Sequence, residues 1–209
     1  MEVVKGYFED RLEKNLENYK IVGYGSKESQ IIRYRVATEI GNLRGKSILD
    51  YGCGLGDLIE YLEKRGISIE YTGYDVSEKI IERARKLHPN HSFEVRDLMK
   101  ELPSQKFSYV FAIGLNVRIA DNVGFIKELV RRMFQIAEEG VFVSVLSSHS
   151  NYFDPQCFYH DPARLLHWCL KNISSRCVLR HDYLPHDFTL YIYQNQIRNG
   201  EEQTRWYKE

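Results

Sequence analysis

The feature that most constrains the fold is a strand, a glycine-rich turn and a helix contained in residues 47–66, which read "SILDYGCGLGDLIEYLEKRG". An apolar run ends in three alternate glycines, Gly52, Gly54 and Gly56, and apolar residues then recur at helical spacing. A strand that passes directly into a helix is typical of an α/β sheet. Such a turn directs backbone N–H groups and the positive end of the helix toward a ligand, so an anionic group is expected there.

Apolar runs return along the chain at intervals of about 20 to 35 residues with helical patterns between them, which is typical of βαβ units. Only "YLPH", residues 183–186, separates the last two runs, and this is too short for a parallel crossover. We therefore predict an α/β fold with a doubly wound, seven-stranded, mostly parallel sheet, helices on both faces and the last two strands paired antiparallel at one edge. The predicted strands are residues 47–51, 69–75, 92–95, 107–114, 140–146, 176–182 and 188–194.

We expect a single domain over residues 1–209. Residues 46–195 form its predicted core, and residues 196–209 a polar tail. Residues 1–45 form an N-terminal helical cap with a helix predicted over 26–43. Two interpretations of this cap stay open: a lid over a substrate, or a helix that covers one face of the sheet.

Charge and composition favour a small partner. Lys and Arg together number 29, as do Asp and Glu, so no net charge draws the chain to nucleic acid or to a membrane surface. No apolar stretch has the length of a signal peptide or of a membrane span, so a cytoplasmic location is expected. The cysteines, Cys53, Cys157, Cys169 and Cys177, lack metal-ligand spacing, and we predict free thiols and no metal site.

The glycine spacing argues against a nicotinamide dinucleotide. The dinucleotide fingerprint GxGxxG would place its third glycine at position 57, where this chain has Asp57. Asp50 and Asp57 would both face the pyrophosphate and repel it. They suit a zwitterion that places a carboxylate on the turn amides and an ammonium beside an aspartate, and S-adenosylmethionine is such a molecule.

Two further strand ends carry carboxylates. Asp75 follows Gly52 by 23 residues, near the spacing at which an acidic residue binds a ribose diol. The alternative is that Asp75 only caps the helix that starts near Ser77. Asp97 lies at the same predicted edge, where it would accept a hydrogen bond from an adenine amino group.

The segments "ILDYGCGLGDL", "YTGYDVSEKIIERAR", "FEVRDL" and "FSYVFAIGLN" together resemble the successive motifs of class I S-adenosylmethionine-dependent methyltransferases, over about residues 45–195. The preceding "GYGSKESQIIRYRV" resembles the leader of small stand-alone bacterial and archaeal members. The resemblance implies a seven-stranded sheet with an antiparallel last strand, and S-adenosylmethionine as cofactor. It places the turn at the methionine part, Asp75 with its neighbours at the ribose, Asp97 with Leu98 at the adenine, and Ile113 with Gly114 beneath the sulfonium. The residues so implied are Tyr51, Gly52, Cys53, Gly54, Tyr74, Asp75, Val76, Asp97, Leu98, Ile113 and Gly114.

The cap helix supplies a candidate partner for the methionine carboxylate. Ser26, Gln30 and Arg33 share one helix face, opposite the apolar stripe of Ile32, Val36 and Ile40. We predict that the guanidinium of Arg33 binds the carboxylate, with Ser26 beside it. Two alternatives stay open: Arg33 is a solvated helix residue, or the nearby Arg35 binds the carboxylate instead.

The acceptor of the methyl group is less constrained. After the fourth strand, "GLNVR" lacks the Asn/Asp-Pro-Pro-aromatic turn of many amino N-methyltransferases, which disfavours their substrates. Asn116 contacts the substrate or is only a turn residue. His149 and His160 lie in the polar and aromatic loop 147–162 and are candidate general bases, or ordinary loop residues. Aromatic residues expected over the pocket are Tyr7, Phe8, Tyr24 and Tyr152.

We therefore predict a methyltransferase that acts on a small-molecule acceptor, as a monomer or homodimer. RNA or protein methylation is the first alternative, although no added binding domain is seen in the sequence. A nicotinamide oxidoreductase and a non-catalytic cofactor-binding protein are further alternatives. The sequence does not identify the acceptor or the atom that receives the methyl group.

Overall fold

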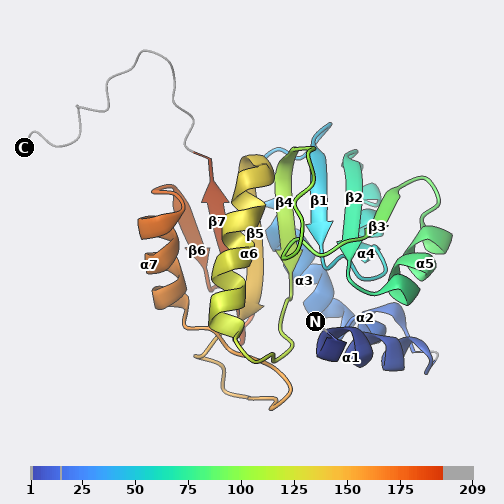
Figure 1. Cartoon of the computed structure of the whole chain (residues 1–209), viewed down its shortest axis with the longest axis horizontal. Coiled ribbons are helices and arrows are strands. Elements are labelled where there is room, and N and C mark those ends of the chain that lie inside the picture. The colour runs from blue at the N-terminus through green and yellow to red at the C-terminus, as the bar shows by residue number, and fades with distance from the viewer. Residues whose placement is uncertain (1, 15, 195–209) are drawn as a thin grey trace, which may run out of the picture.

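In the computed structural model, which describes residues 2–14 and 16–194, seven strands form one sheet (Figure 1). Their order is β3-β2-β1-β4-β5-β7-β6, and every neighbouring pair is parallel except the two pairs that include β7. This confirms the predicted fold. The strands are β1 (Ser47–Tyr51), β2 (Glu70–Asp75), β3 (Ser92–Val95), β4 (Phe107–Ile113), β5 (Ala137–Leu146), β6 (Cys177–Arg180) and β7 (Asp187–Tyr193).

Helices cover both faces of the sheet because the central strands are apolar on both sides. In β4, Val110 packs on the side of α6 and α7, while Phe111 packs on the side of α3, α4 and α5. The same alternation holds for neighbouring residues of β1, β5 and β7. The helices are α1 (Glu2–Leu12), α2 (Asn18–Ile21), α3 (Lys27–Thr38), α4 (Asp57–Glu63), α5 (Glu78–Leu87), α6 (Asn122–Ile136) and α7 (Pro162–Asn172).

Strand β7 lies inside the sheet, between β5 and β6, and is antiparallel to both. The last two strands therefore pair antiparallel at one edge of the sheet, as predicted, with β6 outermost. The short 183–186 link makes a hairpin of β6 and β7, and the hairpin joins the sheet through the apolar strand β7, all of whose residues but the last are buried. Tyr191 and Tyr193 of β7 donate hydrogen bonds from their hydroxyls to the carbonyls of Val36 (2.7 Å) and Ile40 (3.0 Å).

Helices α1, α2 and α3, which we call the cap, precede β1 in the chain. α1 and α2 lie low in Figure 1, below the ends of the parallel strands, whereas α3 packs against the face of the sheet that also carries α4 and α5. Asp57 at the start of α4 accepts hydrogen bonds from Asn18 Nδ2 and Gln30 Nε2, each at 3.0 Å. Glu9 of α1 accepts one from Ser77 Oγ at 2.8 Å, at the start of α5. The cap is therefore joined to the helices that follow β1 and β2.

Two predicted details hold and one boundary shifts. Ser77 caps α5, its Oγ accepting a hydrogen bond from the Ile80 amide. All four cysteines are free. The predicted helix over 26–43 is shorter, Lys27–Thr38, with Ser26 as its N-cap. Within the described residues, no helix combines the length and the apolar character needed to cross a membrane.

Candidate functional site

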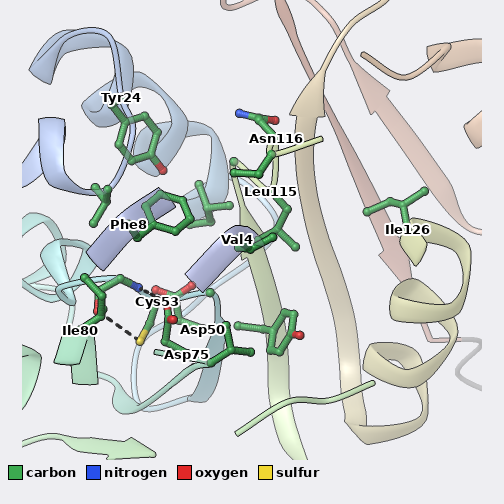
Figure 2. A pocket seen from close by; sticks show the side chains of 18 of the residues that line it. Val4, Phe8, Tyr24, Asp50, Cys53, Asp75, Ile80, Leu115, Asn116 and Ile126 are labelled. Atoms are coloured by element: carbon green, nitrogen blue, oxygen red, sulfur yellow. Dashed lines mark hydrogen bonds between the residues drawn. The ribbon is translucent and has the colours of Figure 1, made fainter. Parts of the chain in front are cut away.

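A cavity opens at the carboxyl ends of β1, β2 and β4, between the glycine turn, the cap and the residues that follow β4 (Figure 2). The empty space between its lining residues, with the open solvent at its mouth included, is about 1120 Å³. The carboxyl edge of an open parallel sheet is where such folds bind ligands. The lining residues are Val4, Phe8, Val22, Tyr24, Tyr34, Asp50, Tyr51, Gly52, Cys53, Gly54, Asp57, Asp75, Val76, Ile80, Ile113, Gly114, Leu115, Asn116, Val117, Ile119, Asn122, Phe125, Ile126 and His160.

The turn after β1 requires glycine. Gly52 and Gly54 adopt φ of +74° and +55°, a region that disfavours residues with a Cβ. A Cβ on Gly52 would lie 2.9 Å from Leu115 Cδ2, and one on Gly54 would lie 2.6 Å from Val22 Cγ1. The bare backbone of the turn is therefore a wall against which a ligand can lie.

The expected nest of free turn amides is not found. The amides of Gly52 and Cys53 both donate to the Tyr74 carbonyl, at 2.7 and 3.0 Å, and the Gly54 amide donates to Asp75 Oδ2 at 3.2 Å. These bonds close the turn onto the end of β2. The turn amides are used within the protein because a buried turn must satisfy its own donors whether or not a ligand is present.

Asp50, the last residue but one of β1, is buried and lines the cavity, low in Figure 2. Its Oδ2 accepts a hydrogen bond from the Tyr71 hydroxyl at 2.9 Å, and its Oδ1 has no partner among the described residues. Burial raises the pKa of this carboxyl to about 7. A cationic group of a ligand placed at Oδ1 would favour the ionised form.

Asp75 at the end of β2 also lines the cavity. Its Oδ1 accepts from the Ser77 amide at 3.0 Å and its Oδ2 from the Gly54 amide, and burial raises its pKa. Each carboxylate oxygen has a second lone pair, so these bonds leave acceptor capacity for a diol. The third lining carboxylate, Asp57, already accepts the two hydrogen bonds from the cap described above.

Arg33 lies away from the cavity. Its side chain is buried between α3 and β7, with Nε 2.8 Å from Asp187 Oδ2 and Nη1 donating to the Ser29 carbonyl at 3.1 Å. Ser26 is occupied as the N-cap of α3, where its Oγ accepts from the Ser29 amide. The polar face of α3 is thus turned into the protein, because a buried carboxylate of β7 supplies the partner for Arg33, and the expected solvent-facing or ligand-facing orientation was wrong.

Three other residues of the implied cofactor set, Tyr74, Asp97 and Leu98, do not line the cavity either. Asp97 Oδ1 accepts hydrogen bonds from the Tyr51 hydroxyl at 3.2 Å and from the Met99 amide at 2.9 Å. Tyr51, which does line the cavity, therefore stands in front of Asp97. Tyr74 and Leu98 are buried in the core beside α6.

Some of the residues predicted to contact the methyl acceptor line the cavity and others do not. Asn116, His160, Phe8 and Tyr24 line the cavity, whereas three others do not. His149 is exposed, Tyr152 is 72% exposed, and the Tyr7 hydroxyl accepts a hydrogen bond from Arg11. Sequence reasoning missed the apolar residues that complete this side: Val4, Leu115, Val117, Ile119, Phe125 and Ile126. Apolar residues at alternate positions directly after a buried strand were a sequence signal for Leu115, Val117 and Ile119.

The lining fits S-adenosylmethionine better than a dinucleotide. No lysine or arginine is among the described lining residues, so a pyrophosphate would meet no cation there. Asp50 lines the cavity with one oxygen that has no partner among the described residues, which suits a cationic group such as a sulfonium or an ammonium. The turn backbone without Cβ atoms and the apolar residues Val76 and Ile80 suit the rest of the molecule.

Comparison with known proteins agrees with this chemistry. Residues 48–139 match the family model described as a methyltransferase domain. A protein of Mycobacterium tuberculosis that is named a methyltransferase is 29% identical over 153 residues, covering 70% of this chain and 92% of that protein. A ubiquinone biosynthesis O-methyltransferase of Pseudomonas fluorescens is 27% identical over 110 residues, which cover 51% of this chain and 47% of that enzyme.

The fold is also that of a solved methyltransferase. The magnesium protoporphyrin IX methyltransferase of Synechocystis with bound S-adenosylmethionine superposes with a TM-score of 0.62 and 19% identity. The superposition covers 92% of this chain and 96% of that one. At this level of identity the match concerns the fold.

Proposed function

Because the chain is a class I, Rossmann-like methyltransferase that uses S-adenosylmethionine, we propose that it methylates an uncharged small molecule enclosed between the cap and the residues after β4. One observation carries the proposal: the acceptor side of the cavity is apolar and closed by the cap. Phe8, Leu115, Val117, Ile119 and Phe125, which we call the acceptor wall, present hydrocarbon surface there.

The cofactor supplies an activated methyl group, so the protein must chiefly bind, orient and exclude water. We propose that Asp75 binds the ribose hydroxyls and that Asp50 binds a cationic group of the methionine part. The backbone of Gly52 and Gly54 lies against the ligand. The cap excludes water by placing Phe8 and Tyr24 over the site.

Two further points support a small acceptor. The ubiquinone biosynthesis enzymes are named for a small-molecule pathway, although the chain spans about half the length of the one compared above. Long polymers need an open groove and a basic surface, whereas this cavity has a cap over it and no lining cation among the described residues.

We further propose a single domain in which residues 1–45 cap a core of residues 46–195; the predicted tail, 196–209, lies outside the described residues. The free cysteines are consistent with a reducing, cytoplasmic location, which we also propose. The oligomeric state, monomer or homodimer, remains a prediction for light scattering to test.

The test is release of S-adenosylhomocysteine with three acceptor pools: neutral metabolites, total RNA and a peptide library. We expect release only with the metabolites, and none from an Asp75→Ala variant assayed beside the wild type. Release only with RNA or peptides would refute the small-molecule proposal. Cofactor binding without release in any pool would favour the non-catalytic alternative.

A further inference from the structure

Three polar side chains from separate segments border the acceptor side of the cavity: Tyr24 of the cap, Asn116 after β4 and His160 before α7. In Figure 2, Tyr24 and Asn116 lie at the end of the cavity away from Asp50 and Asp75. The acceptor wall is otherwise apolar. Asn122 also lines this side, but its Oδ1 accepts from the Ile119 amide at 2.9 Å and its Nδ2 donates to the Val117 carbonyl at 3.0 Å. Tyr24, Asn116 and His160 are therefore the groups best able to orient an acceptor by hydrogen bonds.

The backbone of Leu146, the last residue of β5, holds Asn116 and His160 together. The Leu146 amide donates to Asn116 Oδ1 at 3.1 Å, and the Leu146 carbonyl accepts from the His160 amide at 2.8 Å. The oxygen of the Asn116 amide is thereby used, which leaves the Nδ2 hydrogens. Among the described residues, Nδ2 has no partner, so Asn116 presents a fixed donor.

His160 presents a complementary group. The residue is only 6% exposed, and its ring packs against Phe158 at 4.7 Å between centroids. Neither ring nitrogen has a hydrogen-bond partner in the described part of the chain. Burial lowers its pKa to about 4, so the ring is neutral near pH 7. A neutral imidazole keeps one nitrogen lone pair as an acceptor.

We infer that the acceptor is an uncharged hydroxyarene or enol that is methylated on oxygen, its reacting O–H donating to His160 and a neighbouring second oxygen accepting from Asn116. The inference rests on the proposed function and names its substrate class. One donor and one acceptor side chain, on two residues that both bond to the backbone of Leu146, match a hydroxyl beside a second hydroxyl or a carbonyl.

The reaction balances without a further reagent. The acceptor oxygen forms a bond to the methyl carbon while the carbon–sulfur bond breaks and leaves its electrons on sulfur, giving S-adenosylhomocysteine. The hydroxyl proton passes to the free ring nitrogen of His160 and from there to water. A weakly basic imidazole takes a proton more readily from a phenol or enol, with a pKa of about 10, than from an alkanol.

An amine acceptor fits less well. At neutral pH an alkylamine is a cation, and the acceptor wall offers no carboxylate to it. Of the lining aspartates, Asp57 is bound to the cap, and Asp50 and Asp75 lie near the carboxyl ends of β1 and β2, away from the acceptor wall.

The first experiment compares four probes of similar size at millimolar concentration: catechol, phenol, benzylamine and cyclohexanol. We expect S-adenosylhomocysteine release to be fastest with catechol, at least tenfold slower with phenol, and undetectable with benzylamine and cyclohexanol. Equal rates for benzylamine and catechol, or no turnover of either hydroxyarene, would overturn the inference. Methylation of amines with no hydroxyarene turnover would overturn it while leaving a small-molecule methyltransferase in place.

The second experiment uses His160→Gln, with His149→Gln as the matched control on the exposed part of the same loop. We expect His160→Gln to lower kcat with catechol at least tenfold, to bind S-adenosylhomocysteine with unchanged affinity, and to regain activity as the pH approaches the pKa of catechol itself. Asn116→Asp replaces the donor and should raise KM for catechol more than for phenol. A wild-type pH profile in His160→Gln would exclude His160 as the proton acceptor.

Discussion

At the scale of single residues, Asp75 and Asp97 offer a paired test because they follow neighbouring strands with the same functional group. Asp75 lines the cavity, whereas Asp97 lies behind Tyr51. We expect Asp75→Ala to weaken S-adenosylmethionine binding by about 2 to 4 kcal/mol, because a charge-assisted contact to the diol is lost. Asp97→Ala, which acts only through Tyr51, should cost much less. Titration calorimetry on the folded variants measures both binding free energies. Equal losses of binding free energy would support a direct contact between Asp97 and the adenine.

Asp50 makes the ligand-free protein sensitive to pH. Burial holds its pKa at about 7, above the usual value near 4, so the native state retains a proton that the unfolded chain has lost between these values. The stability of the protein therefore falls as the pH rises from about 4 to about 7, and is level above that. Asp50→Asn should unfold at a higher temperature than the wild type at pH 8, and the difference should shrink as the pH falls and vanish below about pH 4.

The same proton links pH to cofactor binding. A cationic group beside Asp50 lowers its pKa, so the wild type should bind S-adenosylmethionine more tightly at pH 8 than at pH 6 and release a proton on binding. Asp50→Asn should bind more weakly and show no such dependence. Calorimetry in two buffers of different ionisation enthalpy detects the proton, and a pH-independent wild-type affinity would contradict the assignment.

At the scale of elements, α3 depends on a partner far away in the sequence. Asp187 of β7 is fully buried and pairs with Arg33, so Arg33→Met leaves that carboxylate without a cation. We expect a loss of about 3 to 5 kcal/mol in the free energy of unfolding. Arg35→Met, at an exposed position of the same helix, is the control, and Arg33→Met with Asp187→Asn should recover part of the loss. Equal midpoints for the two single variants in urea would refute this role.

The Arg33–Asp187 ion pair also shows where prediction from the sequence succeeds and where it fails. The strands were found to within about three residues because buried parallel strands are continuous apolar runs with recognisable ends. The lining glycines and Asp75 followed from strand, turn and spacing. The inward orientation of Arg33 was not predictable from periodicity, because it depends on a carboxylate in a strand that pairs only in the folded sheet. The separation of His160 from His149 likewise depends on Leu146, which holds only one of them.

At the scale of the whole molecule, the balanced charge predicts how the enzyme responds to salt. A neutral acceptor that enters a cavity without lining cations releases no counterions. We expect KM for the acceptor to change by less than about twofold between 50 and 300 mM potassium chloride. A steep, log-linear loss of activity over this range would instead indicate a polyanionic substrate and revive RNA methylation.

The interior position of β7 affects how the chain folds during its synthesis. The cap is translated first, yet α3 is held by Asp187, Tyr191 and Tyr193, which are among the last described residues to emerge from the ribosome. A nascent chain that stops before residue 187 has the glycine turn and both site aspartates, but lacks the ion pair and the two tyrosine hydrogen bonds that β7 gives to α3. The ligand pocket therefore matures only after β7 has inserted between β5 and β6, a long-range step of the kind that slows folding.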